Sequence, residues 1–473
     1  MSLSEQITQL KKQKWVDLHG LISCAMTHLS TAGPCTSISL LGRGSYSHVY
    51  KLVFTDGNQI AASISNHDEE DFNPRAKCSE IETMRFVRDS GLYPDIPVPR
   101  VYAFDTTFNN PAGAPYVLMD VVQGQTLHHV SDDNNDLRGL DALPREQQLS
   151  IVRSLAKLKA SLLKPVPFDT IGSITTTAQG DHVVGPLMTI TQRCLGGPFK
   201  SIEDLWRDRI EDSIIHALQE WSGEEKDDDL TFYLSDFHCT PQTFSEIVQL
   251  LSALIPHFTI PPPYTTLCLH HPDLALRNIF FDDTKITGVI DWGGAQILPL
   301  LLTARYPDDI MSTADEPFER PGHPDEDWHS VPNDWTSIGD RSQFPVAFRG
   351  KESEPFDFAP RARAMVGRFY LRTYFSACIA ETTTDLSRAT IFKDAPYYLK
   401  FHETVCGGWS AWVRHQAWIK ETYWRLRLAG GQEGMLIIGP NVYKGSVQAL
   451  VRDLGALEEE PPAEEPAKND EFD

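Results

Sequence analysis

The chain has 473 residues, of which 41% are hydrophobic and 10% aromatic. This composition can bury a sizeable core, which excludes wholesale disorder. The chain carries 65 acidic residues against 42 lysines and arginines, a formal net charge of −23. Because such a charge repels nucleic acid and anionic lipid, we expect partners other than nucleic acid or a membrane.

Cysteine usage and apolar runs bear on the compartment. The eight cysteines are scattered and form no Cys-x-x-Cys pair, which fits a reducing compartment rather than a zinc ribbon or a disulfide framework. No apolar run approaches the roughly 18 residues of a membrane span, and the N-terminal stretch lacks the apolar segment of a signal peptide. The sequence predicts a cytoplasmic protein. Lys11, Lys12 and Lys14 keep a mitochondrial location open as a minor alternative, and the oligomeric state stays open.

Periodicity and turn residues predict a mainly antiparallel unit in the first part of the chain. Residues 1–35 have helical spacing, and residues 37–65 alternate apolar and polar positions around two glycine-containing turns, as a β-meander does. One helix and two further strands are expected over 77–90, 100–104 and 115–122. We therefore expect residues 37–124 to form a small sheet with one helix.

The remainder of the chain is predicted to be mainly helical. The expected elements are three helices and two short apolar strands, over 145–163, 361–381, 396–428, 266–269 and 288–290. Residues 305–360 are rich in Pro, Asp and Gly, which predicts a long surface excursion. The acidic low-complexity stretch 456–473 predicts disorder.

The polar loop between the two short strands carries the residues that point to chemistry. The first strand runs into His271-Pro272-Asp273, Asn278 follows five residues after Asp273, and Asp291 ends the second strand. Phosphoryl transfer from a nucleotide needs one carboxylate for the proton of the acceptor hydroxyl, and an amide and a second carboxylate for Mg²⁺. The alternative interpretation, an ordinary strand–loop–strand with polar capping residues, explains single members of this set better than the ordered whole.

A glycine-rich segment lies about 230 residues before this loop. Gly42, Gly44 and Ser45 lie at a turn of the meander, and Val49 follows in the next strand. Glycines let backbone amides approach phosphates, and an apolar residue after the turn can cover an adenine. The pattern alone is typical of a plain hairpin, but its position ahead of the 268–292 segment favours a nucleotide site.

Together these segments resemble a known family. The resemblance is carried by residues 79–87, 96–102, 113–119 and 268–292, and the string ITGVIDW at 286–292 is especially characteristic. Over residues 37–430 or so, the chain is similar to the aminoglycoside phosphotransferase family of the protein-kinase-like superfamily, and most of all to its fungal group.

The resemblance implies an α+β, bilobal protein-kinase-like fold with a small antiparallel-sheet N-lobe and a mainly helical C-lobe. The implied parts are an N-terminal helical extension, a nucleotide-binding N-lobe, a C-lobe with the catalytic loop and acceptor site, and a C-terminal segment with a disordered acidic tail, over 1–36, 37–124, 125–430 and 431–473. The implied activity is ATP-dependent transfer of the γ-phosphoryl group to a hydroxyl of a small-molecule acceptor, with ATP and Mg²⁺ as cofactors.

The resemblance also implies a role for individual residues. Asp273 would be the catalytic base, His271 would brace the loop, and Asn278 and Asp291 would hold Mg²⁺. Glu80 would pair with a cation on the third strand. The remaining implied nucleotide contacts are the glycine-rich turn, the residue after it and the hinge, at Gly42, Gly44, Ser45, Val49, Met119 and Val121.

One departure from the family pattern matters for this activity. Ser63 occupies the third-strand position where the family carries Lys or Arg, and a hydroxyl supplies no charge to the phosphates. We favour Lys51 as the substitute, since it lies two residues after Val49 and shares its strand face. Lys77, three residues before Glu80 on the same helix, is a second candidate. An ordinary solvated lysine is the plain interpretation of both.

Alternative functions follow from these departures. The loss of the cation at Ser63 fits a pseudokinase that binds a nucleotide or a partner without catalysis. A protein kinase is less favoured, because Asp291-Trp292-Gly293 replaces Asp-Phe-Gly. The acidic pairs around Asp308 and Asp325 would attract a cationic acceptor, or they are simply solvated. The identity of the acceptor does not follow from the sequence.

Overall fold

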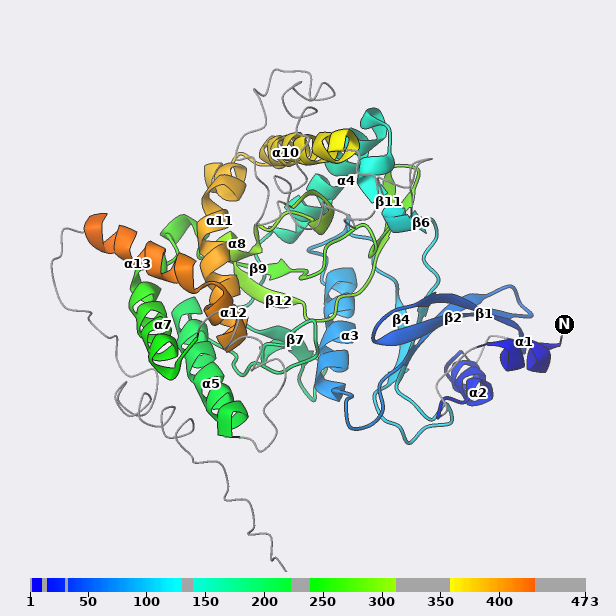
Figure 1. Cartoon of the computed structure of the whole chain (residues 1–473). Coiled ribbons are helices and arrows are strands. Elements are labelled where there is room, and N and C mark those ends of the chain that lie inside the picture. Colours follow the sequence, from blue (N-terminus) through cyan, green and yellow to red (C-terminus); the bar gives the residue numbers. More distant parts are fainter. Residues whose placement is uncertain are drawn as a thin grey trace, which may run out of the picture. The chain divides into compact units, whose positions relative to one another are not determined.

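The computed structural model describes residues 2–10, 15–29, 33–129, 139–222, 239–311 and 358–429 (Figure 1). The chain divides into two compact units. The first comprises Met1–Pro198 and Pro263–Lys393, and the second comprises Phe199–Pro262 and Asp394–Asp473. Most of the predicted surface excursion 305–360, the acidic Asp325 region and the predicted disordered stretch 456–473 lie outside the described residues.

The first unit opens with a five-stranded antiparallel sheet of order β1-β2-β3-β5-β4. Its strands are β1 (Cys35–Arg43), β2 (Ser47–Phe54), β3 (Gln59–Ser65), β4 (Val101–Asp105) and β5 (Tyr116–Asp120). The expected meander over 37–65 and both following strands are confirmed. The β2–β3 turn is closed by Asp56, whose carboxylate accepts from the Asn58 backbone N–H at 3.0 Å, as turn-forming Asp residues do.

The two faces of this sheet differ in what they pack against. Alternate residues of β2 and β3 are buried in one apolar cluster with α1 (Leu3–Gln9) and α2 (Leu18–His28), among them Leu21, Tyr50, Leu52, Ile60 and Ile64. Because side chains alternate along a strand, the residues between them point to the opposite face. Val49, Lys51 and Ser63 belong to that second face.

Helix α3 (Pro74–Asp89) follows the meander. Asn73 caps it by accepting from the backbone N–H groups of Arg75 and Ala76 at 3.0 and 3.3 Å, and Pro74 occupies the first turn, where its missing N–H costs nothing. These signals start the helix three residues before the predicted 77–90. The α3 helix also contacts β7 (Ser173–Thr176), which pairs with β8 (His182–Gly185).

The connection from β5 to the rest of the unit is held tightly. It leads to β6 (Gln125–Thr126), which pairs with β10 (Ile279–Asp282), and β10 pairs with β11 (Lys285–Val289). At Gly124 φ is +97°, and a Cβ there would come within 2.4 Å of the Phe281 carbonyl oxygen. The space beside Gly288 is likewise occupied: a Cβ at that glycine would lie 2.2 Å from Val122 Cγ1. These two glycines let the connecting segment lie directly on the β10–β11 hairpin.

Further elements complete the first unit. Strand β9 (Leu267–His270) pairs with β12 (Gln296–Pro299), which is followed by α8 (Leu300–Thr303), and α4 (Arg145–Leu162) packs against α10 (Phe358–Glu381). The predictions of strands over 266–269 and 288–290 and of helices over 145–163 and 361–381 are confirmed to within a few residues. Strands β10 and β12 were not predicted.

The second unit is helical. It contains α5 (Ile202–Ser222), α7 (Pro241–Leu254), most of α11 (Leu386–Cys406), α12 (Gly408–Arg414) and α13 (Gln416–Ala429). The ring of Phe401 contacts those of Phe258 and Trp206, with centroids 4.0 and 4.9 Å away. The prediction of one helix over 396–428 is wrong, because Gly408 adopts φ +74° and separates α11 from α12.

Aromatic residues of these last helices serve mainly as core. Trp409, Trp412 and Tyr423 are buried, whereas Trp424 is 50% exposed. In the described part of the chain, no helix is both long and apolar enough to cross a membrane.

The tight packing of the connecting segment between β5 and β6 yields a stability prediction. Gly124→Ala should destabilise the protein by about 3 kcal/mol or more, because it combines a positive φ with a clash against a backbone oxygen. Gly180→Ala is the matched control: φ is +89° there, but a Cβ would meet nothing within 4 Å, so only about 1 kcal/mol is lost. Urea unfolding measures both, and equal losses would contradict the packing argument.

Candidate active site

Three polar groups come together where β9 and β11 end and β10 begins. Asp273 and Asn278 lie on the loop between β9 and β10, and Asp291 follows two residues after β11. The backbone N–H of Ile290 donates to the Asn278 carbonyl at 3.0 Å, so the residue before Asp291 is joined directly to Asn278. The structure therefore brings together the three residues that the sequence singled out in this loop.

Asp273 is held at both carboxylate oxygens. Asn278 Nδ2 donates to Asp273 Oδ2 at 2.7 Å and to the Asp273 backbone carbonyl at 3.0 Å, while the Arg277 guanidinium contacts Asp273 Oδ1. Asp273 and Asn278 are each 7% exposed. Since its amide nitrogen is fixed on Asp273, Asn278 has its amide oxygen available for a further ligand.

His271 is bonded at both ring nitrogens. Nδ1 accepts from the Asp273 backbone N–H at 3.2 Å, and Nε2 lies 3.1 Å from the Ile290 carbonyl oxygen, to which it donates. Burial lowers the pKa of His271 to about 4, so the ring is neutral at physiological pH, as these two bonds require. The ring thus links the loop to the strand end that precedes Asp291.

Asp291 has unusual backbone and electrostatic surroundings. Its φ of +61° is rare for a residue with a side chain. Although the residue keeps contact with solvent, loss of solvation among the surrounding protein atoms raises its pKa to about 6. The Glu80 carboxylate adds to this rise, and the Lys77 ammonium opposes it. Perturbation of this kind is frequent at functional sites.

Helix α3 contributes an ion pair beside Asp291. Lys77 Nζ lies 2.6 Å from Glu80 Oε2, and the two side chains are only 12% and 21% exposed. A Cβ placed on Gly293 would lie 3.5 Å from Asp291 Oδ1 and 3.8 Å from Glu80 Oε2. Both carboxylates therefore flank the backbone of Gly293.

The glycine-rich turn is sterically open. Gly42 pairs with Val49 across the β1–β2 hairpin, and the Gly44 N–H donates to the Ser47 carbonyl at 2.8 Å. A Cβ on Gly42 would meet nothing within 4 Å, and one on Gly44 would meet only Ser47 O at 3.6 Å. The fold itself does not require these two glycines, so the open space over the turn, with Ser45 exposed within it, is free for a ligand.

Strand pairing defines the position of the missing cation. Ser63 pairs with Val49 on one side and Val117 on the other, while Ala61 pairs with Lys51 and Met119. Lys51 and Ser63 thus lie on the same face of adjacent strands, as expected, but in different rows. No Lys or Arg occupies the Ser63 row of these strands.

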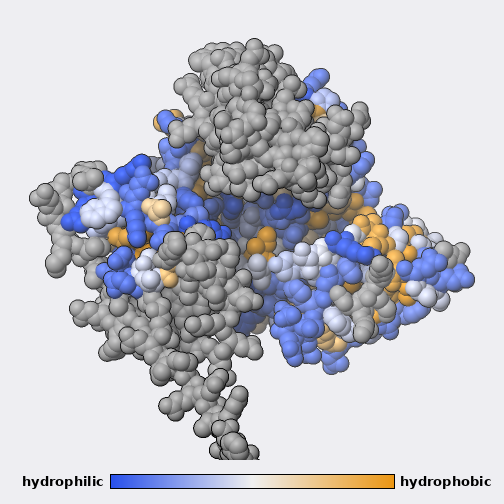
Figure 2. Space-filling model, in the orientation of Figure 1, coloured by the Kyte–Doolittle hydropathy of each residue, from blue (hydrophilic) through white to orange (hydrophobic). Residues whose placement is uncertain are grey.

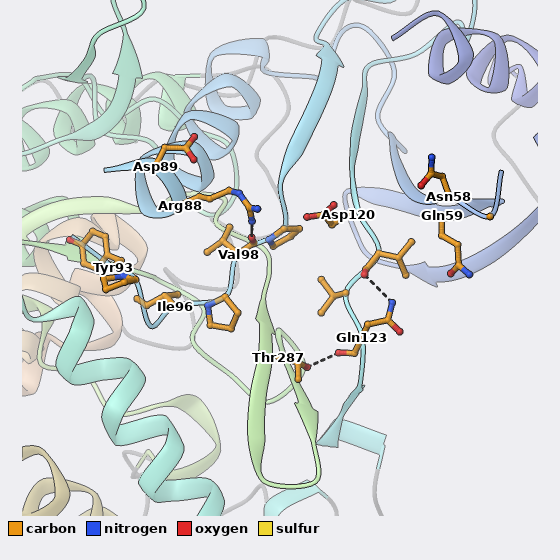
Figure 3. A pocket seen from close by; sticks show the side chains of 16 residues that line it. Asn58, Gln59, Arg88, Asp89, Tyr93, Ile96, Val98, Asp120, Gln123 and Thr287 are labelled. Atoms are coloured by element: carbon orange, nitrogen blue, oxygen red, sulfur yellow. Dashed lines mark hydrogen bonds between the residues drawn. The ribbon is translucent and has the colours of Figure 1, made fainter. Parts of the chain in front are cut away.

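A cavity of about 850 Å³ lies beside the connecting segment (Figure 3). It is lined by the β2–β3 turn at 57–59, the end of α3, residues 93–94 and 96–99, Asp120 to Gln123, and Thr287. Gln123 Nε2 donates to the Val121 carbonyl at 3.3 Å, and Thr287 donates to the Gln123 carbonyl at 2.6 Å. Among the predicted nucleotide contacts this cavity includes Val121 alone, so it is separate from the Asp273, Asn278 and Asp291 group.

Apolar surface remains around the N-terminal sheet. Figure 2 shows it at the right of the molecule, over the region of the sheet, and Leu41, next to Gly42, is 48% exposed.

The donor set fits Mg²⁺ when phosphates complete its coordination. Among the described residues, no three His, Cys, Asp or Glu side chains group as a metal cage. Mg²⁺ commonly binds one or two protein oxygens together with phosphate oxygens and water. One amide oxygen from Asn278 and the carboxylate of Asp291 match that requirement.

Sequence reasoning missed the partners of the catalytic loop. Arg277 contacts Asp308 at 3.2 Å as well as Asp273, and Asp309 accepts from the Leu276 N–H at 2.7 Å. The acidic pair Asp308-Asp309 is therefore part of the loop's own bonding. No local signal links residues that are 31 and 33 positions apart.

The raised pKa of Asp291 has a measurable effect on folding. Its folded pKa of about 6 exceeds the ordinary 3.8, so its contribution to stability is present below pH 3.8 and lost as the pH rises through 6. Asp291→Asn should therefore stabilise the ligand-free protein above pH 6, by on the order of 1 kcal/mol because solvent screens this carboxylate. Unfolding at pH 4 and pH 7.5 measures it, and a difference that does not grow with pH would contradict the assignment.

Comparison with known proteins places these observations in a family. The model of the family described as phosphotransferase enzyme family matches residues 38–302. A subtelomeric hrmA-associated cluster protein of Aspergillus fumigatus is 27% identical over 366 residues, which cover 67% of this chain and 68% of that protein. The protein named altered inheritance of mitochondria protein 9, mitochondrial, of Zygosaccharomyces rouxii is 25% identical over 269 residues, 47% of this chain and 42% of its own length.

Solved structures were also compared. An aminoglycoside phosphotransferase, APH(4)-Ia in its apo form, is 14% identical, with a TM-score of 0.38 over 84% of this chain and 99% of that chain. A putative fructosamine-3-kinase from Thermobifida fusca is 13% identical, with a TM-score of 0.37 over 83% and 98%.

The expected α+β class is confirmed, with an antiparallel N-terminal sheet followed by a mainly helical C-terminal part. The family match spans more than half of the chain and includes the glycine-rich turn, α3, the catalytic loop and Asp291. The chain therefore belongs to the phosphotransferase enzyme family.

Proposed function

We propose that the protein is a Mg²⁺-dependent small-molecule kinase, which transfers the γ-phosphoryl group of ATP to a hydroxyl of its acceptor. The observation that carries this proposal is the hydrogen-bonded group of Asp273 and Asn278, joined through the Ile290 backbone to Asp291. Membership of a phosphotransferase family supports the reaction class.

Asp273 would be the catalytic base. Its carboxylate would accept the hydroxyl proton as the acceptor oxygen bonds to the γ-phosphorus and the bond to the bridging oxygen of ADP breaks. Asn278 fixes the orientation of this carboxylate through its 2.7 Å hydrogen bond. His271 would brace the loop, because its bonds to Asp273 and Ile290 use both ring nitrogens.

Asn278 Oδ1 and the Asp291 carboxylate would hold Mg²⁺, which when bound offsets the negative charge of the phosphates. The open backbone at Gly42, Gly44 and Ser45 would receive the phosphates. Val49 would cover the adenine, and backbone groups at Met119 and Val121 would meet its edge. Glu80 would keep the local cation in place.

The comparisons do not choose the acceptor, and we propose only a small hydroxyl compound. A cytoplasmic location stays a prediction; the Zygosaccharomyces relative bears a mitochondrial name. The lobe boundaries at 37–124 and 125–430 likewise stay a proposal.

A pseudokinase is the second candidate, and Ser63 is the observation that favours it. A protein of this kind would be stabilised by Mg²⁺–ATP without turning it over. Thermal stabilisation by ATP, measured beside release of labelled phosphate on a broad panel of hydroxyl compounds, separates the two functions. Stabilisation without transfer to any compound would favour the pseudokinase.

The catalytic proposal predicts specific losses. Asp273→Asn and Asp291→Ala should each lower kcat by about 10³-fold or more, because one removes the proton acceptor and the other a metal ligand. The control is Asp282→Asn, an exposed carboxylate on the β10–β11 hairpin, which should keep wild-type turnover. Steady-state kinetics on the acceptor found in the panel measures all three. Full activity of Asp291→Ala would show that the metal assignment is wrong.

A further inference from the structure

Because Ser63 is uncharged, β3 supplies no positive charge to the phosphates at the proposed nucleotide site. A triphosphate beside Asp273, Asp291 and Glu80 meets three carboxylates, and one Mg²⁺ cannot offset all of these charges. A protein cation is needed near the glycine-rich turn. The two candidate lysines are Lys51, on the same sheet face as Ser63, and Lys77, on α3 beside Glu80.

Lys77 is not an ordinary surface lysine. Its side chain is 12% exposed and its ammonium lies 2.6 Å from Glu80, whereas a surface pair of this protein, Arg425 with Glu421, leaves side chains 78% and 58% exposed. A lysine ammonium is strongly hydrated, and its burial costs free energy unless it is paired. Lys77 is therefore a largely buried, paired cation rather than a solvated one.

The place of Lys77 is also significant. Its partner Glu80 lies with Asp291 around the backbone of Gly293, so the ammonium borders the carboxylate proposed to hold the metal. Lys77 thus lies beside the end of the site where phosphates and metal would meet.

Lys51 has a less favourable place. It lies in the row of Ala61, whereas Ser63 lies in the row of Val49. Along β2 the glycine-rich turn precedes Ser47, so Lys51 is two residues, or about 7 Å, farther from that turn than the Ser63 row. It shares the correct face but is displaced toward the β2–β3 turn.

We propose that Lys77 supplies from α3 the phosphate-binding cation that β3 lacks, so that an ion pair within one helix replaces the strand-to-helix pair. This inference rests on the proposed function, and the ligand group is the phosphate chain of a nucleoside di- or triphosphate. The flexible four-carbon stem lets the ammonium keep Glu80 and bind a phosphate oxygen with its remaining donors.

The test is nucleotide binding by titration calorimetry on the full chain. Lys77→Met should weaken binding of Mg²⁺–ADP and Mg²⁺–ATP by roughly tenfold to a hundredfold, the range of a lost charged hydrogen bond, and leave adenosine binding within twofold. The unchanged adenosine affinity also shows that the variant is folded. The matched control is Lys285→Met, an exposed lysine on β11, with wild-type affinities.

A rescue variant and a comparison with Lys51→Met make the test more specific. Ser63→Lys in the Lys77→Met background should restore Mg²⁺–ADP affinity to within a few-fold, since it returns the charge to β3. The loss in Lys77→Met should exceed that in Lys51→Met by at least tenfold.

Two outcomes overturn the assignment and differ in meaning. In the first outcome, the wild-type protein binds Mg²⁺–ADP, but Lys77→Met binds it with the same affinity, or Lys51→Met loses more affinity than Lys77→Met does. This outcome would exclude the role of Lys77 and leave the proposed function standing. Wild-type protein that binds no adenine nucleotide removes the proposed function and this inference with it.

Discussion

The candidate site depends on how the loop that carries Asp273 and Asn278 is bonded to the backbone of Ile290. The Ile290 N–H donates to the Asn278 carbonyl, and the Ile290 carbonyl accepts from His271. Both peptide groups of the residue before Asp291 are thus committed to the loop that carries Asp273. The relative positions of three polar side chains follow from main-chain bonds and one buried ring. Little conformational freedom is left to lose when a ligand binds, which is the condition for a preorganised site.

The sequence could predict that Asp273, Asn278 and Asp291 come together because these residues are local; their roles stay a proposal. Asp273 and Asn278 are five residues apart on one loop, and the apolar strand before Asp291 marks its end. The N-terminal sheet was predictable for a similar reason, since buried residues alternate with less buried ones along the second half of β2, although β3 alternates less regularly. Strand β10 was missed because Ile279-Phe280-Phe281 does not alternate, and the helix break at Gly408 was missed because glycine is tolerated inside helical patterns. The contacts of Arg277 with Asp308 and the burial of Lys77 arise only on folding, so no spacing rule predicts them.

Electrostatics explain why the cations matter in this protein. The chain carries a net charge of −23, and an anionic nucleotide approaches against that field. At the site, Glu80 and Asp273 each have a cation in contact, Lys77 and Arg277 respectively. Loss of solvation raises the pKa of Asp291 to about 6. A carboxylate that is stabilised by losing its charge is also stabilised by a bound cation, so the electrostatic cost that raises the pKa of Asp291 would favour the Mg²⁺ proposed to bind there.

The Lys77–Glu80 ion pair lies within α3 and so does not attach this helix to the sheet. A strand-to-helix ion pair would tie α3 to β3, and the Lys77–Glu80 pair does not. Other contacts anchor the helix instead: Asn73 Nδ2 donates to the Gln192 carbonyl at 2.7 Å, and Glu82 lies 3.4 Å from His182 on β8. Arg85 lies over the ring of Phe104 on β4, at 5.0 Å. Because these contacts fix α3 to both the sheet and the β7–β8 region, the helix can present a cation without a partner on β3. With Lys77 in the role proposed for it, Ser63 would be compatible with an active kinase, and the binding and transfer experiments separate this case from the pseudokinase.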